Sequence, residues 1–221
     1  MIYFMPICEA DQMETQYRSW LPQLPSARQK KLLRYRFAKD RWLCAAAYML
    51  LLHGLQNEYG IAKEQVKMEV EEFGKPYLAS HPHIFFNLSH CDLGVVCGLS
   101  DAPIGIDIES IRKITPRVVK RVLNDAEQEI MTRSRNPELT FTSMWTLKES
   151  LIKAIGCGFQ RSISEATVSL SVDGDLYIQQ DGYRAYVLVQ EGLYCISVCS
   201  NRVSNTHYFV RKISLTQLVI W

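Results

Sequence analysis

Long hydrophobic runs are absent from this sequence. The longest, which contains Cys44–Leu52, reaches about half of the ~20 apolar residues that a membrane-spanning helix needs. The N-terminus has no basic segment ahead of its apolar stretch, and Pro6 interrupts that stretch. We therefore expect neither a membrane helix nor a cleaved signal peptide.

The sequence also lacks an excess of charge of one sign. Its 25 Lys and Arg residues face 23 Asp and Glu residues, which leaves a formal net charge of +2. A dedicated nucleic-acid-binding protein carries a strong basic excess, so that class is excluded and any affinity for phosphate has to be local. With 48% hydrophobic and 22% charged residues over 221 positions, the composition is that of a folded protein with one large domain or two small ones.

Cysteine is present, but not in a pattern that indicates disulfides or a metal site. The seven cysteines are odd in number and scattered, and no pair is spaced as Cys-x-x-Cys. Cys195 and Cys199 share one face of an expected strand, where they suit core packing because no His adjoins them. The pattern predicts reduced thiols and a cytoplasmic location.

The order of helical and strand patterns divides the chain into two similar halves. Each half opens with a strand, continues with helices and ends with a run of strands. Helices are expected at 28–37, 42–59, 116–123, 126–131 and 138–155, and strands at 2–7, 66–70, 83–88, 94–99, 104–108, 166–172, 184–190, 194–199 and 207–211. The sequence thus predicts a mixed α/β (α+β) fold with two subdomains, 1–102 and 103–221, and a ligand site in the cleft between them.

Three carboxylates fall on elements that can present them together. The strand at 105–109 alternates, so that Asp107 and Glu109 share one face. In the last long helix, Glu149 and Lys153 share a face with a tryptophan at i, i+4 spacing. Two plainer interpretations stay open, a strand with one wet face and a surface Glu149–Lys153 ion pair. Taken together, the three acids are hard oxygen ligands that suit Mg²⁺ in a water-exposed site.

Two shorter segments place polar groups at a turn and at a strand end. In a Gly-Lys-Pro-Tyr turn, Pro76 disfavours a helical backbone at Lys75 and so holds that cation in an extended conformation. Asn87 and Ser89 share a face at the end of a strand, and His90, just beyond, is placed to meet a phosphate. A plain surface turn and a structural His are the alternatives.

Four motifs in register carry a family resemblance. They are Gly-Lys-Pro (74–76), Phe-Asn-Leu-Ser-His (86–90), Gly-Ile-Asp-Ile-Glu (105–109) and Trp-x-x-Lys-Glu-x-x-x-Lys (145–153). In this order and at these separations they resemble the 4'-phosphopantetheinyl transferases of the surfactin-synthetase-activating (Sfp-type) class, over nearly the whole chain. The resemblance implies a 4'-phosphopantetheinyl transferase fold, with two similar subdomains in a pseudo-two-fold arrangement and with coenzyme A and Mg²⁺ in the cleft between them.

The resemblance also implies an activity and its residues. The enzyme would be a holo-[carrier-protein] synthase, which moves the phosphopantetheine arm of coenzyme A onto a serine hydroxyl of an apo acyl or peptidyl carrier protein and releases 3',5'-ADP. The groups implied to bind the metal are Asp107, Glu109 and Glu149. Those implied to contact the nucleotide and phosphates are Arg41, Lys75, Pro76, Ser89, His90 and Lys153, together with Lys31 from the basic cluster Arg28, Lys30 and Lys31. Arg41 matches only after a shift of two residues, and the member of the basic cluster that holds the 3'-phosphate stays open.

The implied reaction needs charge neutralisation and one proton transfer. A phosphoryl-type displacement depends on positioning and on cations around the pyrophosphate. The residues implied to act in catalysis are Glu149, Asp107 and Lys153. Either Glu149 or a metal-bound water that it orients takes the proton of the serine hydroxyl. The implied enzyme is a monomer with no nucleic-acid or membrane partner.

Two other classes of function stay open. A Mg²⁺-dependent nuclease also uses strand carboxylates and a Lys-Glu pair, but it would carry a basic surface facing DNA. A non-catalytic module that binds carrier proteins or nucleotides would lack part of the carboxylate set, and all three acids are present. Mg²⁺-dependent labelling of a carrier protein by coenzyme A separates the three classes.

A basic surface is expected beside the metal site. The segment 110–124 contains five basic residues and no acid, and Arg117, Lys120 and Arg121 share a helix face. The carrier proteins that the resemblance implies are acidic around the modified serine. We therefore predict that the segment, which also includes Arg112 and Lys113, docks the carrier; a solvated basic helix face is the alternative.

Overall fold

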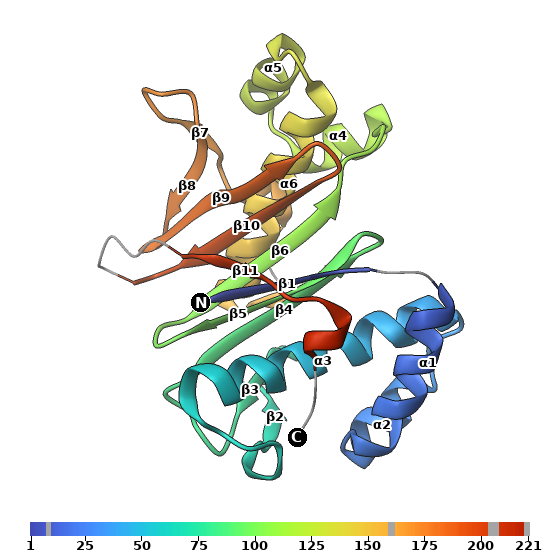
Figure 1. Ribbon diagram of the computed structural model, residues 1–221. Helices are drawn as coiled ribbons and strands as arrows, with labels where there is room; N and C mark the ends of the chain where they lie inside the picture. The colour runs from blue at the N-terminus through green and yellow to red at the C-terminus, as the bar shows by residue number, and fades with distance from the viewer. Residues whose placement is uncertain (8–9, 159–161, 203–207, 219–221) are drawn as a thin grey trace.

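The structure, a computed structural model, describes residues 1–7, 10–158, 162–202 and 208–218. Within these ranges the elements repeat in order: a strand, three α-helices and four strands run from β1 to β5, and the same series runs from β6 to β10 (Figure 1). The repeat confirms the predicted mixed α/β fold with two similar subdomains.

The first half is an antiparallel sheet with a long helix on one face. Its helices are α1 (Ala10–Trp20), α2 (Ser26–Leu32) and α3 (Ala38–Tyr59), with the 3-10 turns η1 (Leu21–Gln23) and η2 (Lys63–Gln65). Its strands are β1 (Ile2–Pro6), β2 (Met68–Val70), β3 (Pro76–Leu78), β4 (Phe85–Cys91) and β5 (Gly94–Ser100). Strand β5 lies between β1 and β4, while β2 and β3 form a separate hairpin.

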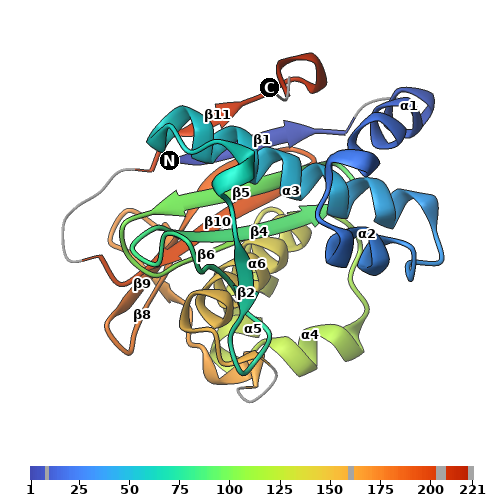
Figure 2. The same cartoon turned by 90° about the horizontal axis from the view of Figure 1, so that it is seen from below.

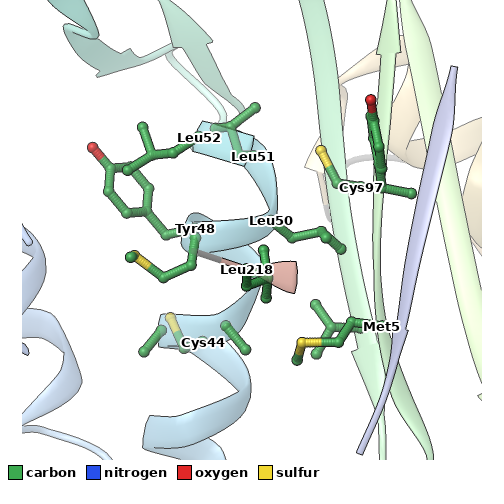
Figure 3. Packing of buried hydrophobic residues seen from close by; sticks show 14 of the residues in the cluster. Met5, Cys44, Tyr48, Leu50, Leu51, Leu52, Cys97 and Leu218 are labelled. Carbon is green, nitrogen blue, oxygen red and sulfur yellow. The ribbon is translucent and has the colours of Figure 1, made fainter. Parts of the chain in front are cut away.

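Helix α3 is buried over most of its length. Its alanines and leucines leave no polar face in the middle of the helix, so it cannot lie on the surface. In Figure 3, Leu50 points from the helix toward Met5 and Cys97 of the sheet, while Tyr48 and Leu52 lie on its other side. The helix therefore forms the centre of the first hydrophobic core.

The second half repeats this plan. Its helices are α4 (Pro116–Val122), α5 (Asp125–Arg133) and α6 (Pro137–Ile155), with the 3-10 turn η4 (Ile163–Glu165). Its strands are β6 (Ile104–Ser110), β7 (Ser169–Leu170), β8 (Leu176–Gln180), β9 (Tyr183–Glu191) and β10 (Tyr194–Ser200), in the spatial order β6-β10-β9-β8-β7. Helix α6 packs on one face of this sheet, with Leu147 and Leu151 in its core (Figure 1).

The two halves share a third hydrophobic core. Ile2, Phe4 and Val96 of the first sheet pack with isoleucines of β6 and β10, all of them buried. Strands β4 and β6, from different sheets, are also joined where Asn87 Oδ1 accepts a hydrogen bond of 3.0 Å from the Ile106 backbone N–H. Figure 2 shows β4 and β6 close together beside α6. The ends of β4 and β6 are thereby brought to one place.

The C-terminal strand β11 (Val210–Lys212), followed by η5 (Leu215–Gln217), returns to the first half. It pairs in parallel with β1, so that Ile213 and Leu218 join the first core. The first sheet accordingly has the order β11-β1-β5-β4. Up to β10, the strand pairing thus assigns β1–β5 and β6–β10 to different sheets, while β11 pairs with the N-terminal sheet. The boundary at 102/103 stays a prediction.

Several elements differ from the sequence prediction. The basic helix expected at 28–37 was placed too far along the chain: α2 ends at Leu32, and extended backbone at Phe37 separates it from α3, which begins at Ala38 rather than at 42. Helix α1 and the strands β3 and β8 were not predicted. The strand expected at 207–211 is observed as Val210–Lys212, and residue 207 lies outside the described ranges.

The structure can be compared with the sequence on two further points, membrane-spanning helices and cysteines. Within the described ranges no helix combines the length and the apolar character that spanning a membrane requires. The six cysteines of those ranges are free thiols, while Cys8 lies outside them. Cys195 and Cys199 are fully buried, which confirms their predicted core packing.

Candidate functional site

The site begins with the close approach of β6 to α6. Gly105 makes this approach possible, because a Cβ atom there would lie 2.0 Å from the Ser150 carbonyl oxygen and 2.4 Å from the Ala154 nitrogen. Along β6, Ile106 and Ile108 turn into the core shared by the two sheets. The intervening Asp107 and Glu109 therefore share the other face of β6, as the strand alternation predicted, and this face meets α6.

A hydrogen-bonded triad connects the two halves at this point. Lys153 of α6 donates to Asp107 Oδ1 at 2.6 Å and to the Ser89 hydroxyl at 2.9 Å. The Ser89 hydroxyl in turn donates to Asp107 Oδ1 at 2.8 Å. The structure thus brings together three predicted site residues, one each from β4, β6 and α6. The expectation of a water-exposed site is wrong for Asp107, which is only 3% exposed because Lys153 of α6 and Ser89 of β4 pack against it.

The other two acids sit in the electrostatic field of Asp107. Burial, followed by the Asp107 charge, raises the pKa of Glu109 to about 7. The same two causes, in the same order, raise the pKa of Glu149. Glu109 and Glu149 therefore both lie in the field of the Asp107 carboxylate and of the Lys153 ammonium group, which lowers their pKa values in part. Such an arrangement is typical of a functional site rather than of a surface ion pair.

The donor set fits a divalent cation in its chemistry. Asp107 Oδ2 is buried and has no hydrogen-bond partner, although a buried carboxylate oxygen normally has one. A cation would satisfy this oxygen and would lower the pKa of Glu109 and of Glu149. Within the described ranges, however, no three His, Cys, Asp or Glu side chains are already grouped closely enough to hold a metal. An ion bound beside Asp107 would therefore take part of its coordination from water and substrate phosphate, as Mg²⁺ commonly does.

A cavity of about 670 Å³ opens beside the triad. It is lined by Lys75 and Pro76 from the first half and by Glu149 and Lys153 from the second. The remaining lining is largely apolar and comes from the turn before β3, from β4, α4 and α6, and from the segment after α6; it includes Trp145. The predicted shared face of Trp145, Glu149 and Lys153 is thus confirmed as one wall of a cleft between the halves. A larger cavity of about 1170 Å³ lies over β8 and β9 and includes none of the three acids.

Lys75 has a structural partner in this cleft. Its ammonium group donates at 2.7 Å to the carbonyl oxygen of Ala154, at the C-terminal end of α6. A cation is favourable there because the last carbonyls of a helix carry partial negative charge. Burial lowers the pKa of Lys75, an effect that Glu71 partly offsets. Lys75 therefore joins the β2–β3 hairpin to α6, while its predicted phosphate contact stays a prediction.

The predicted nucleotide contacts on the N-terminal side are more dispersed. His90 lies on the opposite face of β4 from Ser89; its pKa is lowered by partial burial and by the Lys153 charge. Lys31 is exposed, and Arg41 lies near Glu14. Within the described ranges neither of these two makes a hydrogen bond or ion pair with the three acids, so their predicted roles stay untested.

In the basic cluster at 28–31, the Arg28 guanidinium group lies 4.5 Å above the ring of Tyr48. Two residues that support the site were assigned no role from the sequence. Asn87 fixes β4 against β6, and Gly105 permits the contact with α6. Asn87 and Gly105 both lie within the family motifs named above. Their place in these motifs was the one sign in the sequence that they have a role.

Two family profiles match the chain. Residues 103–199 match the 4'-phosphopantetheinyl transferase superfamily, and residues 11–100 match the N-terminal part of a 4'-phosphopantetheinyl transferase. The two matches meet near residue 102, and together they include the triad and all three acids.

Curated relatives cover most of the chain. The chain is 32% identical over 175 residues to the 4'-phosphopantetheinyl transferase psf-1 of Bacillus pumilus, a match that covers 76% of this chain and 75% of that protein. It is 30% identical over 181 residues to a 4'-phosphopantetheinyl transferase of Bacillus subtilis, with 78% and 80% covered. To the 4'-phosphopantetheinyl transferase Sfp of Bacillus subtilis strain 168 it is 29% identical over 154 residues, with 69% of each covered.

Proposed function

The chain belongs to the 4'-phosphopantetheinyl transferase superfamily, and we propose that it transfers the phosphopantetheine arm of coenzyme A to a serine hydroxyl of an apo carrier protein, with Mg²⁺, and releases 3',5'-ADP. The observation that carries the proposal is the Lys153–Asp107–Ser89 triad near two acids of raised pKa, with Lys153 and Glu149 lining the cleft between the halves. The family is one of enzymes that modify carrier proteins.

The reaction breaks a phosphoanhydride bond of coenzyme A and forms a phosphoester bond to the serine. The serine oxygen forms a bond to the β-phosphorus of coenzyme A, the bond from that phosphorus to the bridging pyrophosphate oxygen breaks, and 3',5'-ADP leaves with that oxygen. When bound, Mg²⁺ neutralises charge on the pyrophosphate. Its protein ligands would be Asp107, through the unpartnered Oδ2, together with Glu109 and Glu149.

Glu149 is the proposed proton acceptor. It lines the cleft directly, where its carboxylate can accept a proton from a substrate hydroxyl. It takes the proton of the serine hydroxyl directly or through a water that it orients. Lys153, on the same face of α6, carries the positive charge that stabilises the developing charge on the phosphates.

The proposed carrier-docking surface is the exposed face of α4. Arg117, Lys120 and Arg121 are exposed there, and Arg121 also lines the cleft. Val122, on another side of this helix, is buried in the second core. A basic surface beside the cleft suits an acidic carrier protein, because complementary charge steers the encounter of the two proteins.

The test is Mg²⁺-dependent labelling. Purified protein is incubated with coenzyme A, an apo carrier protein and Mg²⁺, and the carrier mass is measured before and after chelation with EDTA. The proposal predicts one phosphopantetheine adduct on the serine, absent with EDTA and absent when that serine is Ala. No adduct under any of these conditions would overturn it, and cleavage of DNA by the same sample would favour the nuclease alternative.

A further inference from the structure

A buried ion pair lies where α6 meets the ends of α4 and α5. The side chains of Lys148 and Glu127 are 0% and 1% exposed, and the Lys148 ammonium group lies 2.7 Å from Glu127 Oε2. Lys148 immediately precedes Glu149 in the chain. A pair with so little solvent contact is stable only when its remaining hydrogen-bonding capacity is also satisfied.

Every partner of this pair comes from a different element. Lys148 also donates to the Val122 carbonyl oxygen at 2.9 Å. Glu127 accepts from the backbone N–H groups of Asn124, at 2.9 Å, and Val168, at 2.8 Å. The pair therefore connects the end of α4, the N-cap of α5 and the segment before β7 to the middle of α6.

Helix α4 depends on such contacts for its position. It has only seven residues, Thr115 at its N-terminus makes no side-chain capping bond, and short helices gain little stability from their own hydrogen bonds. Val122 is its last residue, where the carbonyl group has no partner within the helix. The Lys148 ammonium group supplies that partner, and a cation at a helix C-terminus is favourable.

The same helix forms one wall of the cleft. Val118, Arg121 and Val122 line the cavity across from Glu149 and Lys153. We propose that Lys148 is a positioning residue: by holding the end of α4 against α6, it fixes the α4 wall and its basic face relative to Glu149 and so governs how well the carrier protein docks. The inference rests on the proposed function, because it takes the carrier as the partner of α4.

The test compares Lys148→Met with a control of similar destabilisation. Ile178→Ala removes a buried side chain from the same core, on β8, and Ile178 neither lines the cleft nor takes part in the Lys148–Glu127 pair. We expect Lys148→Met to raise the KM for carrier several-fold with kcat little changed, and to speed backbone hydrogen exchange in α4. The affinity for coenzyme A, measured by calorimetry without turnover, should match that of the parent. Ile178→Ala should lower the Tm yet keep the parent's KM and α4 exchange.

Two results overturn the inference. One is a carrier KM and α4 exchange in Lys148→Met that match those of Ile178→Ala. The other is a loss of coenzyme A affinity as large as the rise in KM, since the whole site would then have loosened. If Lys148→Met does not fold, the double variant Lys148→Met with Glu127→Gln leaves no unpaired buried charge, and it should fold and show the same rise in KM and in α4 exchange. Parent-like values in a folded double variant overturn the inference as well.

The design separates this inference from the proposed function. A parent protein that transfers nothing overturns the proposed function. The exchange rates of α4 in Lys148→Met and Ile178→Ala need no turnover, so they still decide whether Lys148 positions that helix.

Discussion

At the scale of single residues, the acids of the cleft are placed for chemistry rather than for stability. Asp107 is buried with one carboxylate oxygen bonded to Lys153 and Ser89 and the other without a partner. Glu109 and Glu149 are both held with raised pKa values by burial and by that neighbouring charge. Functional sites commonly retain such strain, and substitutions that relieve it stabilise the fold at the expense of activity.

Glu149→Gln should abolish transfer without lowering stability. The substitution removes the proposed base, a loss of about 10²-fold to 10⁴-fold in rate, and it also removes a charge that Asp107 disfavours. The Tm in EDTA should therefore equal or exceed that of the parent. Glu138→Gln, on the same helix and outside the cleft lining, is the matched control and should keep parent turnover. Near-native turnover of Glu149→Gln would show that Glu149 is not the base.

The metal-free protein should lose stability as the pH rises through neutrality. The pKa of Glu109 is raised to about 7 from an ordinary value of 4.5. Between these two pH values the folded state keeps a proton that the unfolded chain releases. The stability that this proton gives to the folded state is complete below the unfolded pKa and is lost as the pH passes the folded pKa. In EDTA, the Tm of the parent should fall more steeply from about pH 5 to about pH 8 than the Tm of Glu109→Gln. If the Tm of the two proteins changed with pH in parallel, Glu109 would not be the group that causes the loss of stability.

At the scale of elements, function depends on how closely α6 lies against β6. Gly105 has no side chain to separate them, and Glu149 and Lys153 reach the cleft from α6 only at this spacing. The second determinant is α4, whose basic face borders the same cleft. The two helices thus contribute different functions, chemistry from α6 and docking from α4.

Gly105→Ala should disturb both stability and transfer. The new Cβ would meet backbone atoms of α6 at 2.0 Å and 2.4 Å, which rotation of a side chain cannot relieve. Forcing the helix away should cost about 1–3 kcal/mol or more and displace Glu149 and Lys153. Gly192→Ala, where a Cβ meets nothing within 4 Å, is the control and should behave like the parent. Thermal unfolding and carrier labelling measure the two effects, and a parent-like Gly105→Ala would show that α6 tolerates a larger spacing.

Reversing the charge of α4 should weaken docking of the carrier. Arg117→Glu with Arg121→Glu should raise the KM for carrier and flatten its dependence on salt, because exposed charges act through a field that is screened over about 10 Å at 0.1 M salt. Turnover at saturating carrier and the affinity for coenzyme A should change little. Arg133→Glu with Arg135→Glu, exposed at the end of α5, is the matched reversal and should leave the KM unchanged. Parent-like kinetics at low salt in the α4 variant would place the docking surface elsewhere.

At the scale of the whole molecule, the two halves form one cooperative structure. The core between the sheets takes side chains from β1, β5, β6 and β10. Lys75 joins the β2–β3 hairpin to α6, and β11 returns from the second half to pair with β1. Neither half keeps its buried surface without the other, so the cleft keeps its shape only in the complete fold.

Ile106→Ala should destabilise both halves together. Ile106 is fully buried in the core that the two sheets share, and truncating such a side chain costs about 2–5 kcal/mol. Denaturant unfolding should remain a single transition at a lower midpoint, and hydrogen exchange should rise by the same factor in α3 and in α6. A separate, earlier transition confined to the second half would show that the halves unfold independently.

The sequence by itself determined the local geometry of the site. Strand alternation set the common face of Asp107 and Glu109, and helical spacing set the common face of Glu149 and Lys153. The end of α6 was also predicted correctly, because a helix commonly ends at a glycine. Gly156 takes the left-handed conformation that such an end requires, with a φ of +79°. Helix α1 was open to prediction too, because Met13, Tyr17 and Trp20 form an apolar stripe at helical spacing. The motifs extended these local features to a family and a fold.

Only the tertiary structure decided which of these groups meet. It paired Lys153 with Asp107 rather than with Glu149, four residues before it on the same helix, and it turned Lys75 to the end of α6. It also buried Asp107, which a strand with one wet face would have left exposed, and it assigned Lys148, within a recognised motif, to a buried pair with Glu127. The physical reason is that periodicity fixes the direction of a side chain only relative to its own element. Contacts between elements depend on how the two sheets dock, and that is set by the shared core of residues far apart in the chain.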